Sequence, residues 1–193
     1  MKKFELTNEF ITNMFGTKLF RIRALVKFGD VEAGELGGYV EKESNLGHDD
    51  NAWVYDNAWV YGDAQVSGNA RVYGDAQVSG NALVCGNAWV YGNAQVSGDA
   101  QVSGNARVYG NGDYAYAHGF GSVNRTTTFF RLKDGGVGVR CGCFYGTLAQ
   151  FRDKIRETHG ETKKAQEYLM LADLMELRFE EDENEVGNRK YVE

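Results

Sequence analysis

Two cysteines and a histidine near the C-terminus have the side chains of a metal site. Cys141 and Cys143 are separated by one glycine on an expected strand, and His159 follows downstream. Thiolate and imidazole groups are common ligands of zinc. A Cys-x-Cys pair is a weaker signal than two spaced Cys-x-x-Cys pairs, and small buried cysteines in a hairpin are the simpler interpretation. We therefore assign no metal and no other cofactor, and we keep zinc binding by this trio as the alternative.

Acid–base and nucleophilic chemistry have few candidates in this chain. His48 precedes the regular part of the sequence and His118 follows it, while Cys85 is the one strong nucleophile between residues 51 and 110. A histidine can act as a general base, but an isolated histidine is more often structural. The glycines recur at a fixed spacing, which is not the pattern of a phosphate-binding loop. We therefore expect no catalytic residues and a protein that is not an enzyme.

The elements that must position any site are set by a six-residue period. From Asn51 to Gly110, ten consecutive hexads read Asn/Asp-Ala-x-Val-y-Gly, with Asp56 in place of one glycine. Ala and Val are two residues apart and share one face of a strand, so the x and y residues share the other. Gly followed by Asn or Asp supplies a corner, because these residues tolerate positive φ. The pattern predicts a solenoid with stacked Val and Ala inside.

Hexads that close as a triangle give an 18-residue coil, and here the sequence resembles the hexapeptide-repeat family of left-handed parallel β-helices. The family pattern places a small residue four positions after an aliphatic one, as in Val60/Ala64 and Val66/Ala70. The left hand is implied by the resemblance, since general rules for parallel crossovers favour the opposite hand. The fold expected is mainly β, a left-handed β-helix with a small C-terminal β-hairpin and two-helix cap.

Every third hexad lies on the same face of an 18-residue coil, so one face carries an aromatic and cationic column. Two faces are mostly Gln and Ser, whereas on the third Arg can stack on Trp beside an unbroken Tyr column. Trp, Tyr and Arg dominate protein-binding hot spots, so we predict partner binding there. The alternatives are a platform for a planar ligand, a seam covered by the chain's own helices or by a second copy, and a 36-residue duplication without a role. The predicted partner-binding residues are Trp53, Tyr55, Arg71, Tyr73, Trp89, Tyr91, Arg107 and Tyr109.

The first fifty residues predict a cap for the exposed solenoid edge. Residues 18–28 alternate well enough to form a strand. Residues 31–40 read as an irregular first coil, with corners expected at Gly34, Gly37 and Gly38.

The segment after Gly110 predicts a mixed module. Residues 126–133 and 137–144 flank Asp134-Gly135-Gly136, which is a hairpin signal. Thr147 can cap a helix that ends at Gly160, and a second helix is expected over about 162–178. The second helix is apolar over more than half of its girth, so we expect it to pack on the hairpin and also on a second copy of the chain. Its apolar residues are Tyr168, Leu169, Met170, Leu171, Ala172, Leu174, Met175 and Leu177.

Two further runs resemble a narrower group. The run RIRALVKFGDVEAGELGGYV followed by DDNAWVYDNA is similar to the opening of YdcK-like hexapeptide proteins, and VRCGCFYGTLAQF resembles a module of uncharacterised phage and prophage proteins. The resemblance implies a bacterial, phage or prophage protein. Hexapeptide β-helices are best known as trimeric acyltransferases that use a histidine and bind coenzyme A or acyl carrier protein, and this reading would use His48 or His118.

The composition argues against several classes of function. The formal net charge of −6 and the lack of a Lys/Arg cluster argue against nucleic-acid binding. The sequence has no apolar run near the ~18 residues that span a bilayer. Three cysteines, an odd number, fit a reducing cytoplasm better than a disulfide scaffold. The acidic run at 180–185 reads as a solvated tail.

These observations favour a cytoplasmic binding or scaffold protein with three sections. Residues 1–50 form the N-terminal cap and first coil, 51–110 the repeats, and 111–193 a capping and oligomerisation module. The expected partner is a host or phage protein, which could be a host defence factor, and a homo-oligomer is expected through the C-terminal helices. The alternatives are an acyltransferase-like enzyme and a structural or virion-associated protein.

Overall fold

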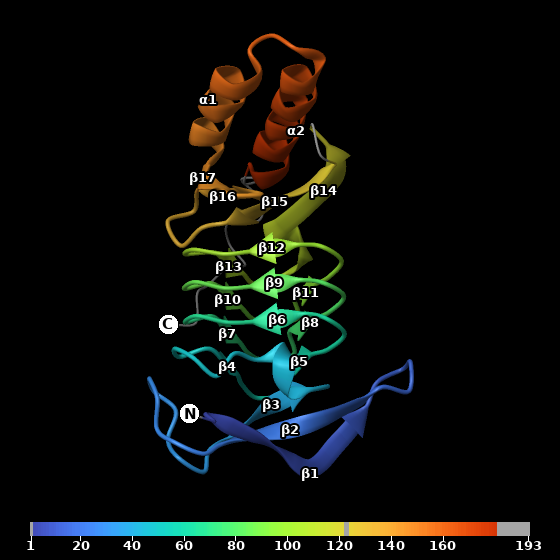
Figure 1. Cartoon of the computed structure of the whole chain (residues 1–193), viewed down its shortest axis with the longest axis vertical. Coiled ribbons are helices and arrows are strands. Elements are labelled where there is room, and N and C mark those ends of the chain that lie inside the picture. The colour runs from blue at the N-terminus through green and yellow to red at the C-terminus, as the bar shows by residue number, and fades with distance from the viewer. Residues whose placement is uncertain (1, 122–123, 181–193) are drawn as a thin grey trace.

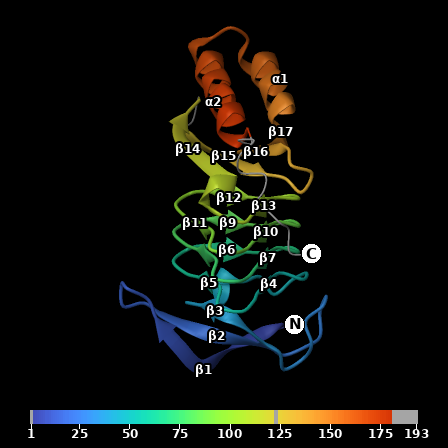
Figure 2. The same ribbon diagram turned by 180° about the vertical axis from the view of Figure 1, so that it is seen from behind.

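The computed structural model describes residues 2–121 and 124–180. The molecule is elongated, and its elements follow one another from the N-terminal strands at one end to the helices at the other (Figure 1). A small N-terminal sheet lies at the bottom, the stacked coils form the middle, and a second sheet and two helices lie at the top. The turned view shows the same order of sections (Figure 2).

The hexads form a parallel β-solenoid, as the period predicts. Each hexad contributes a two-residue strand, and Trp53, Arg71, Trp89 and Arg107 pair in register, 18 residues apart. The strands therefore stack in three faces, ordered β4-β7-β10-β13, β3-β5-β8-β11 and β6-β9-β12, where β3 (Leu36–Val40) precedes the hexads. The handedness of the coil stays a prediction. The strands are β4 (Trp53–Val54), β5 (Trp59–Val60), β6 (Gln65–Val66), β7 (Arg71–Val72), β8 (Gln77–Val78), β9 (Leu83–Val84), β10 (Trp89–Val90), β11 (Gln95–Val96), β12 (Gln101–Val102) and β13 (Arg107–Val108).

The interior of the solenoid is formed by the Ala and Val of every hexad, all fully buried. Backbone hydrogen bonds join each coil to the next, as from the Arg71 N–H to the Ala88 carbonyl at 2.9 Å. At the corners, Gly68 has a φ of +67°, and an added Cβ would lie 3.0 Å from the Gly86 nitrogen. A side chain there would therefore be strained both by its backbone conformation and by the coil above.

Asparagines add a side-chain ladder along one corner. Asn51 donates to Asn69 at 3.0 Å, Asn69 to Asn87 at 3.2 Å, and Asn87 to Asn105 at 3.4 Å, each through its amide nitrogen and the next side-chain oxygen. The sequence predicted these residues only as corner formers. Stacking at an 18-residue period adds the hydrogen bonds.

The N-terminal cap consists of an antiparallel pair and the first strand of the solenoid. Strand β1 (Phe4–Thr12) pairs with β2 (Lys18–Ala24), which pairs with β3 (Leu36–Val40). Strand β3 then runs parallel to β5 and so starts the stack. The predicted strand at 18–28 ends four residues early, at Ala24. A short 3-10 helix, η1 (Glu43–Asn45), follows β3.

Two of the three glycine corners predicted in the cap are wrong. Gly34 lies in a turn with a φ of +88°. Gly37 and Gly38 instead lie inside β3, both buried. A Cβ at Gly37 would lie 2.5 Å from the Val54 carbonyl oxygen, and one at Gly38 2.6 Å from the Ala58 carbonyl oxygen. Their small size is therefore required by close packing and not by a turn.

Above the solenoid, η2 (Asn111–Asp113) leads into a four-stranded antiparallel sheet. The predicted hairpin is confirmed as β15 (Arg125–Arg131) and β16 (Val137–Cys141). The sheet also contains β14 (Tyr114–Phe120) and β17 (Phe144–Thr147), one on each side of the hairpin, which the sequence did not predict.

The two predicted helices are confirmed as α1 (Leu148–His159) and α2 (Lys163–Phe179). Thr147 and Thr162 cap them by accepting backbone N–H groups of Gln150 and Ala165. No helix in the described ranges is long and apolar enough to cross a membrane. Of the acidic run at 180–185, the described part of the chain includes only Glu180. The helical residues buried against the sheet are Leu148, Phe151, Ile155, Ala165, Tyr168, Ala172, Met175 and Phe179.

Candidate docking strip

The predicted aromatic and cationic residues lie on the face formed by β4, β7, β10 and β13, and in the upper part of this face their side chains are half-buried, except for the exposed Tyr109. We call this part the aromatic strip. The helices lie beyond the C-terminal sheet and not over β7 and β10, as both views show (Figures 1 and 2). Covering of the strip by the chain's own helices, one of the alternatives, is thus not what the structure shows. The strip consists of Arg71, Tyr73, Trp89, Tyr91, Arg107 and Tyr109.

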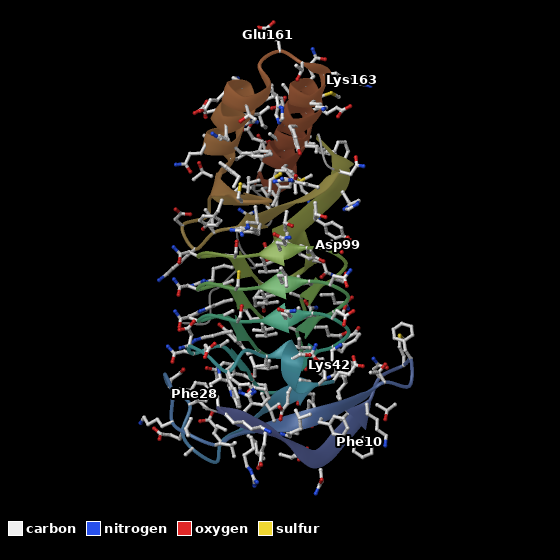
Figure 3. The ribbon with its side chains drawn as sticks, viewed as in Figure 1. Phe10, Phe28, Lys42, Asp99, Glu161 and Lys163 are labelled. Carbon is white, nitrogen blue, oxygen red and sulfur yellow. The ribbon has the colours of Figure 1, made fainter. Side chains whose placement is uncertain are left out.

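Trp53 does not belong to the strip, and its assignment as a partner-binding anchor is wrong. Its side chain is 0% exposed. The indole packs edge-on against Phe4 and Phe28, with ring centroids 6.2 and 5.3 Å away. Figure 3 labels Phe28 at the N-terminal end of the column. Packing of the cap therefore makes Trp53, the first tryptophan of the predicted face, part of the hydrophobic core.

Asp30, in the loop before β3, closes the lower end of the strip. Arg71 donates two hydrogen bonds to its carboxylate, at 2.9 and 3.0 Å, and the Tyr55 hydroxyl donates a third at 3.1 Å. Burial raises the pKa of Tyr55 well above its ordinary value. Tyr55 and Arg71 are thus committed to an internal contact. The sequence carries no signal for it, since Asp30 is 41 residues from Arg71.

Trp89 is the centre of the strip. Its ring lies between two guanidinium groups. The Cζ atom of Arg107 is 4.1 Å from the ring centroid, and the Cζ atom of Arg71 is 5.5 Å from it. Cations over an indole face are held by the ring quadrupole. The predicted Arg–Trp stacking is confirmed at this tryptophan, whereas the buried Trp53 takes no part in it.

Arg107 differs from Arg71 in having no acidic partner among the residues that the structure describes. Its Nη1 donates to the carbonyl oxygens of Ala106 at 2.8 Å and Asn87 at 3.0 Å. Across the described residues, no ion pair to its guanidinium is found. Burial lowers the pKa of Arg107, yet arginine remains charged at neutral pH. This cation is therefore oriented by the backbone and available to a carboxylate from outside.

The tyrosine column is continuous, as predicted. Ring centroids are 5.9 Å apart between Tyr55 and Tyr73, 5.5 Å between Tyr73 and Tyr91, and 5.0 Å between Tyr91 and Tyr109. Tyr109 is the most open member, at 55% exposed. Burial, followed by the neighbouring Tyr91, raises the pKa of Tyr73 to about 12.

This shift predicts an alkaline loss of stability. An unfolded tyrosine ionises near pH 10, whereas folded Tyr73 keeps its proton to about pH 12. The contribution to stability is complete below about pH 10 and is lost as the pH rises through about 12. We expect the urea midpoint to fall across this interval, and Tyr73→Phe to reduce the fall. If the urea midpoint of Tyr73→Phe fell as steeply with pH as that of the wild type, the raised pKa of Tyr73 would not be the cause of the alkaline loss.

The two candidate histidines lie at opposite ends of the solenoid. The His48 ring stacks on Phe4 with centroids 4.5 Å apart, and its Nδ1 accepts the Lys3 backbone N–H at 3.2 Å. His118, on β14, has its Nδ1 2.8 Å from the Thr126 hydroxyl and 3.8 Å from a carboxylate oxygen of Asp99. The structure therefore does not bring the two histidines into one site.

The structure does not bring Cys141, Cys143 and His159 together as a metal site either. Cys141 Sγ accepts a hydrogen bond from the Thr127 hydroxyl at 3.2 Å, whereas Cys143 is exposed. His159 stacks on Tyr168, with centroids 5.9 Å apart. Within residues 2–121 and 124–180, no three His, Cys, Asp or Glu side chains are placed to hold a metal ion. Cys85 is half-buried, and burial raises the pKa of its thiol.

The repeats themselves have a recognised family pattern. Three segments match the YdcK β-solenoid repeat. The matches span residues 64–80, 76–92 and 100–112 and so include Arg71, Trp89 and Arg107. The expected resemblance to YdcK-like proteins is thus supported over the repeats. No curated protein matches the chain.

Proposed function

We propose that this protein is a non-enzymatic, cytoplasmic scaffold that docks a partner protein on the aromatic strip. The observation that carries the proposal is Trp89, held between Arg71 and Arg107 on a face whose backbone is fixed by coil-to-coil hydrogen bonds. A rigid surface loses little conformational entropy on binding, so more of the contact energy appears as affinity. Trp, Tyr and Arg at the centre of a patch are the usual hot-spot residues.

The chemistry of the strip favours a partner with apolar and acidic groups side by side. Trp89 and Tyr109 offer ring surface, and Arg107 offers a cation that no carboxylate of the described residues pairs with. Arg71 is held by Asp30, so its role is to position Trp89 and not to bind the partner's charge. We expect a partner carboxylate to lie over Arg107 while an apolar side chain packs beside Trp89.

We further propose an origin in a phage or prophage and a role in occupying a host protein, such as a defence factor. The support is the resemblance of the two terminal segments to phage and prophage proteins, together with a surface suited to steric blocking. Inhibition would then result from covering the host protein's working surface, without chemistry.

The experiment is affinity capture of tagged protein from host lysate, with and without phage infection, followed by a direct affinity measurement on the captured partner. Trp89→Ala should weaken binding by about 2 kcal/mol or more, roughly thirtyfold in Kd. Trp59→Ala is the matched control, because Trp59 is half-buried like Trp89 but lies on a neighbouring face, paired with Gln77.

The two variants give distinct outcomes. Loss of binding in Trp89→Ala with retention of binding in Trp59→Ala supports the aromatic strip as the docking surface. Equal retention in both variants, with circular dichroism showing both folded, would place the docking surface elsewhere. Equal loss in both would mean that binding depends on the solenoid as a whole.

A further inference from the structure

Helix α2 ends beside the upper end of the aromatic strip. The helix starts at Lys163, at the tip of the molecule, and runs back toward the C-terminal sheet (Figure 3). In its last turn, the Arg178 guanidinium donates a hydrogen bond to the backbone carbonyl of Asn111 at 3.4 Å. Asn111 is the first residue of η2 and follows Tyr109 by two positions. The end of α2 therefore lies close to the most exposed residue of the strip.

The end of α2 is held in place by contacts with the sheet. Arg131 donates a hydrogen bond to the Phe179 carbonyl oxygen at 3.1 Å, and its guanidinium carbon lies 5.6 Å from the centroid of the Phe179 ring. Phe179 is buried, and the backbone N–H of Glu180 donates to the Glu176 carbonyl oxygen at 3.0 Å. The chain after Glu180 thus continues from an anchored point next to η2.

The sequence after this point carries charges opposite to that of Arg107. Residues 181–185, which lie outside the described part of the chain, read Glu-Asp-Glu-Asn-Glu. Arg107 is half-buried and pairs with no acid among the described residues. A charge-assisted hydrogen bond to a carboxylate is stronger than the bonds to neutral carbonyls that Arg107 makes. Tyr191 and Val192 follow, so the same segment has the acidic and apolar groups that suit the strip.

The chain after Glu180 is long enough to reach Arg107. An extended chain advances about 3.3 Å per residue, so residues 181–185 span roughly 16 Å and residues 181–193 roughly 43 Å. Arg107 precedes Asn111 by four residues, so their backbones are at most about 14 Å apart. The ring of Tyr91, in the coil below, is 5.0 Å from that of Tyr109. The length therefore allows the acidic run to lie over Arg107.

We propose that residues 181–185 bind the aromatic strip of the same chain, with a carboxylate paired with Arg107. The sequence predicted this acidic run to be solvated, and the position of the end of α2 gives it a cationic neighbour instead. The contact is intramolecular and so is favoured by a high effective concentration. It occupies the surface on which a partner protein is proposed to dock. The tail is therefore a competitor that the partner displaces, and this consequence rests on the proposed function.

The tryptophans allow the contact to be observed in the full chain without a partner. Each indole N–H gives one cross-peak in a ¹H–¹⁵N NMR spectrum, and Trp89→Phe identifies the peak of the strip. Neutralising the acidic run should move the Trp89 peak, because a charge next to the indole is removed. The peaks of the buried Trp53 and of Trp59, on a neighbouring face, should stay in place. The neutralised variant combines Glu181→Gln, Asp182→Asn, Glu183→Gln and Glu185→Gln.

The matched control is Asp153→Asn with Glu157→Gln, which removes two exposed acids from α1 and should leave all three indole peaks in place. An unmoved Trp89 peak in the neutralised variant would overturn the proposal. A displacement that depends on protein concentration would overturn it as well, since the tail would then bind a second copy. Movement of all three peaks would indicate a change of the whole fold and would equally count against the contact.

Cleavage by a glutamate-specific protease measures the strength of the contact. A bound segment is cut only when it is released, so the cleavage rate follows the released population. Arg107→Gln should make cleavage within 181–185 about threefold faster, the size expected for one ion pair near the surface. Cleavage at Glu161, in the exposed loop between the helices, is the internal reference and should not change. Equal rates within 181–185 in the two proteins, both folded by circular dichroism, would contradict the pairing with Arg107.

The effect on docking is measured separately with the captured partner. A site that is free for only part of the time shows an affinity reduced by that fraction. The neutralised variant should therefore bind the partner about three- to tenfold more tightly than the wild type. A displaced Trp89 peak with unchanged partner affinity would support the tail contact and refute docking on the strip. An unmoved Trp89 peak with partner binding lost in Trp89→Ala would refute the tail contact and support the docking.

Discussion

Trp53→Ala is expected to destabilise the protein by about 3–5 kcal/mol, the cost of removing a large aromatic side chain from a core. The indole is fully buried and lies between the rings of Phe4 and Phe28 at the junction of the cap and the first coil. Its removal leaves a cavity that the rigid coils cannot collapse around. Urea unfolding followed by circular dichroism measures the loss.

The control for this prediction is Trp59→Ala, six residues further along the chain. Trp59 is half-buried and its hexad begins with the same five residues, so its removal should cost clearly less. Trp53→Phe should recover part of the stability, because it keeps an aromatic ring in the cavity. If Trp53→Ala and Trp59→Ala had equal costs, Trp53 would not be the junction residue that we describe.

Gly37→Ala is expected to destabilise the protein by about 1–3 kcal/mol through overpacking. The added Cβ would lie 2.5 Å from the Val54 carbonyl oxygen, 2.7 Å from Ile22 Cγ1 and 2.8 Å from Trp53 Cζ2. All three belong to the buried junction, so none is the end of a flexible surface side chain. The cap would have to move away from the first coil to accept one methyl group.

The matched control is Gly112→Ala, where an added Cβ meets nothing within 4 Å and φ is not positive. Its unfolding free energy should stay within about 0.5 kcal/mol of the wild-type value. A Gly37→Ala protein as stable as Gly112→Ala would show that the cap does not pack against the coil as described.

The solenoid could be predicted because its contacts repeat at short range. Each coil binds the coil 18 residues away through the same Ala, Val and Gly positions, so one hexad predicts the next. The helices α1 and α2 are predictable for a similar reason, since their threonine caps and apolar spacing are local. The exposure of Met170, Leu174 and Leu177 on α2 also follows from its sequence, which has more apolar residues than one packed side can cover.

Which residues belong to the aromatic strip depends on contacts across long sequence separations. Arg71 binds Asp30, which lies in a loop without any sequence pattern. The packing of the cap depends on such contacts as well, since Gly37 and Gly38 are required by the neighbouring coil. Strands β14 and β17 join the predicted hairpin only because the sheet continues on both of its edges. Sequence periodicity carries no information about such pairings.

The pentapeptide Asn-Ala-Trp-Val-Tyr separates the two kinds of information. It occurs at 51–55, 57–61 and 87–91, and each copy forms the same two-residue strand with a buried valine. The sequence by itself therefore determined the backbone and the core of these coils. Only the tertiary structure decided what each tryptophan does. Trp53 is buried because the cap packs on the first coil, whereas Trp89, in the middle of the stack, lies between two coils and is only half-buried.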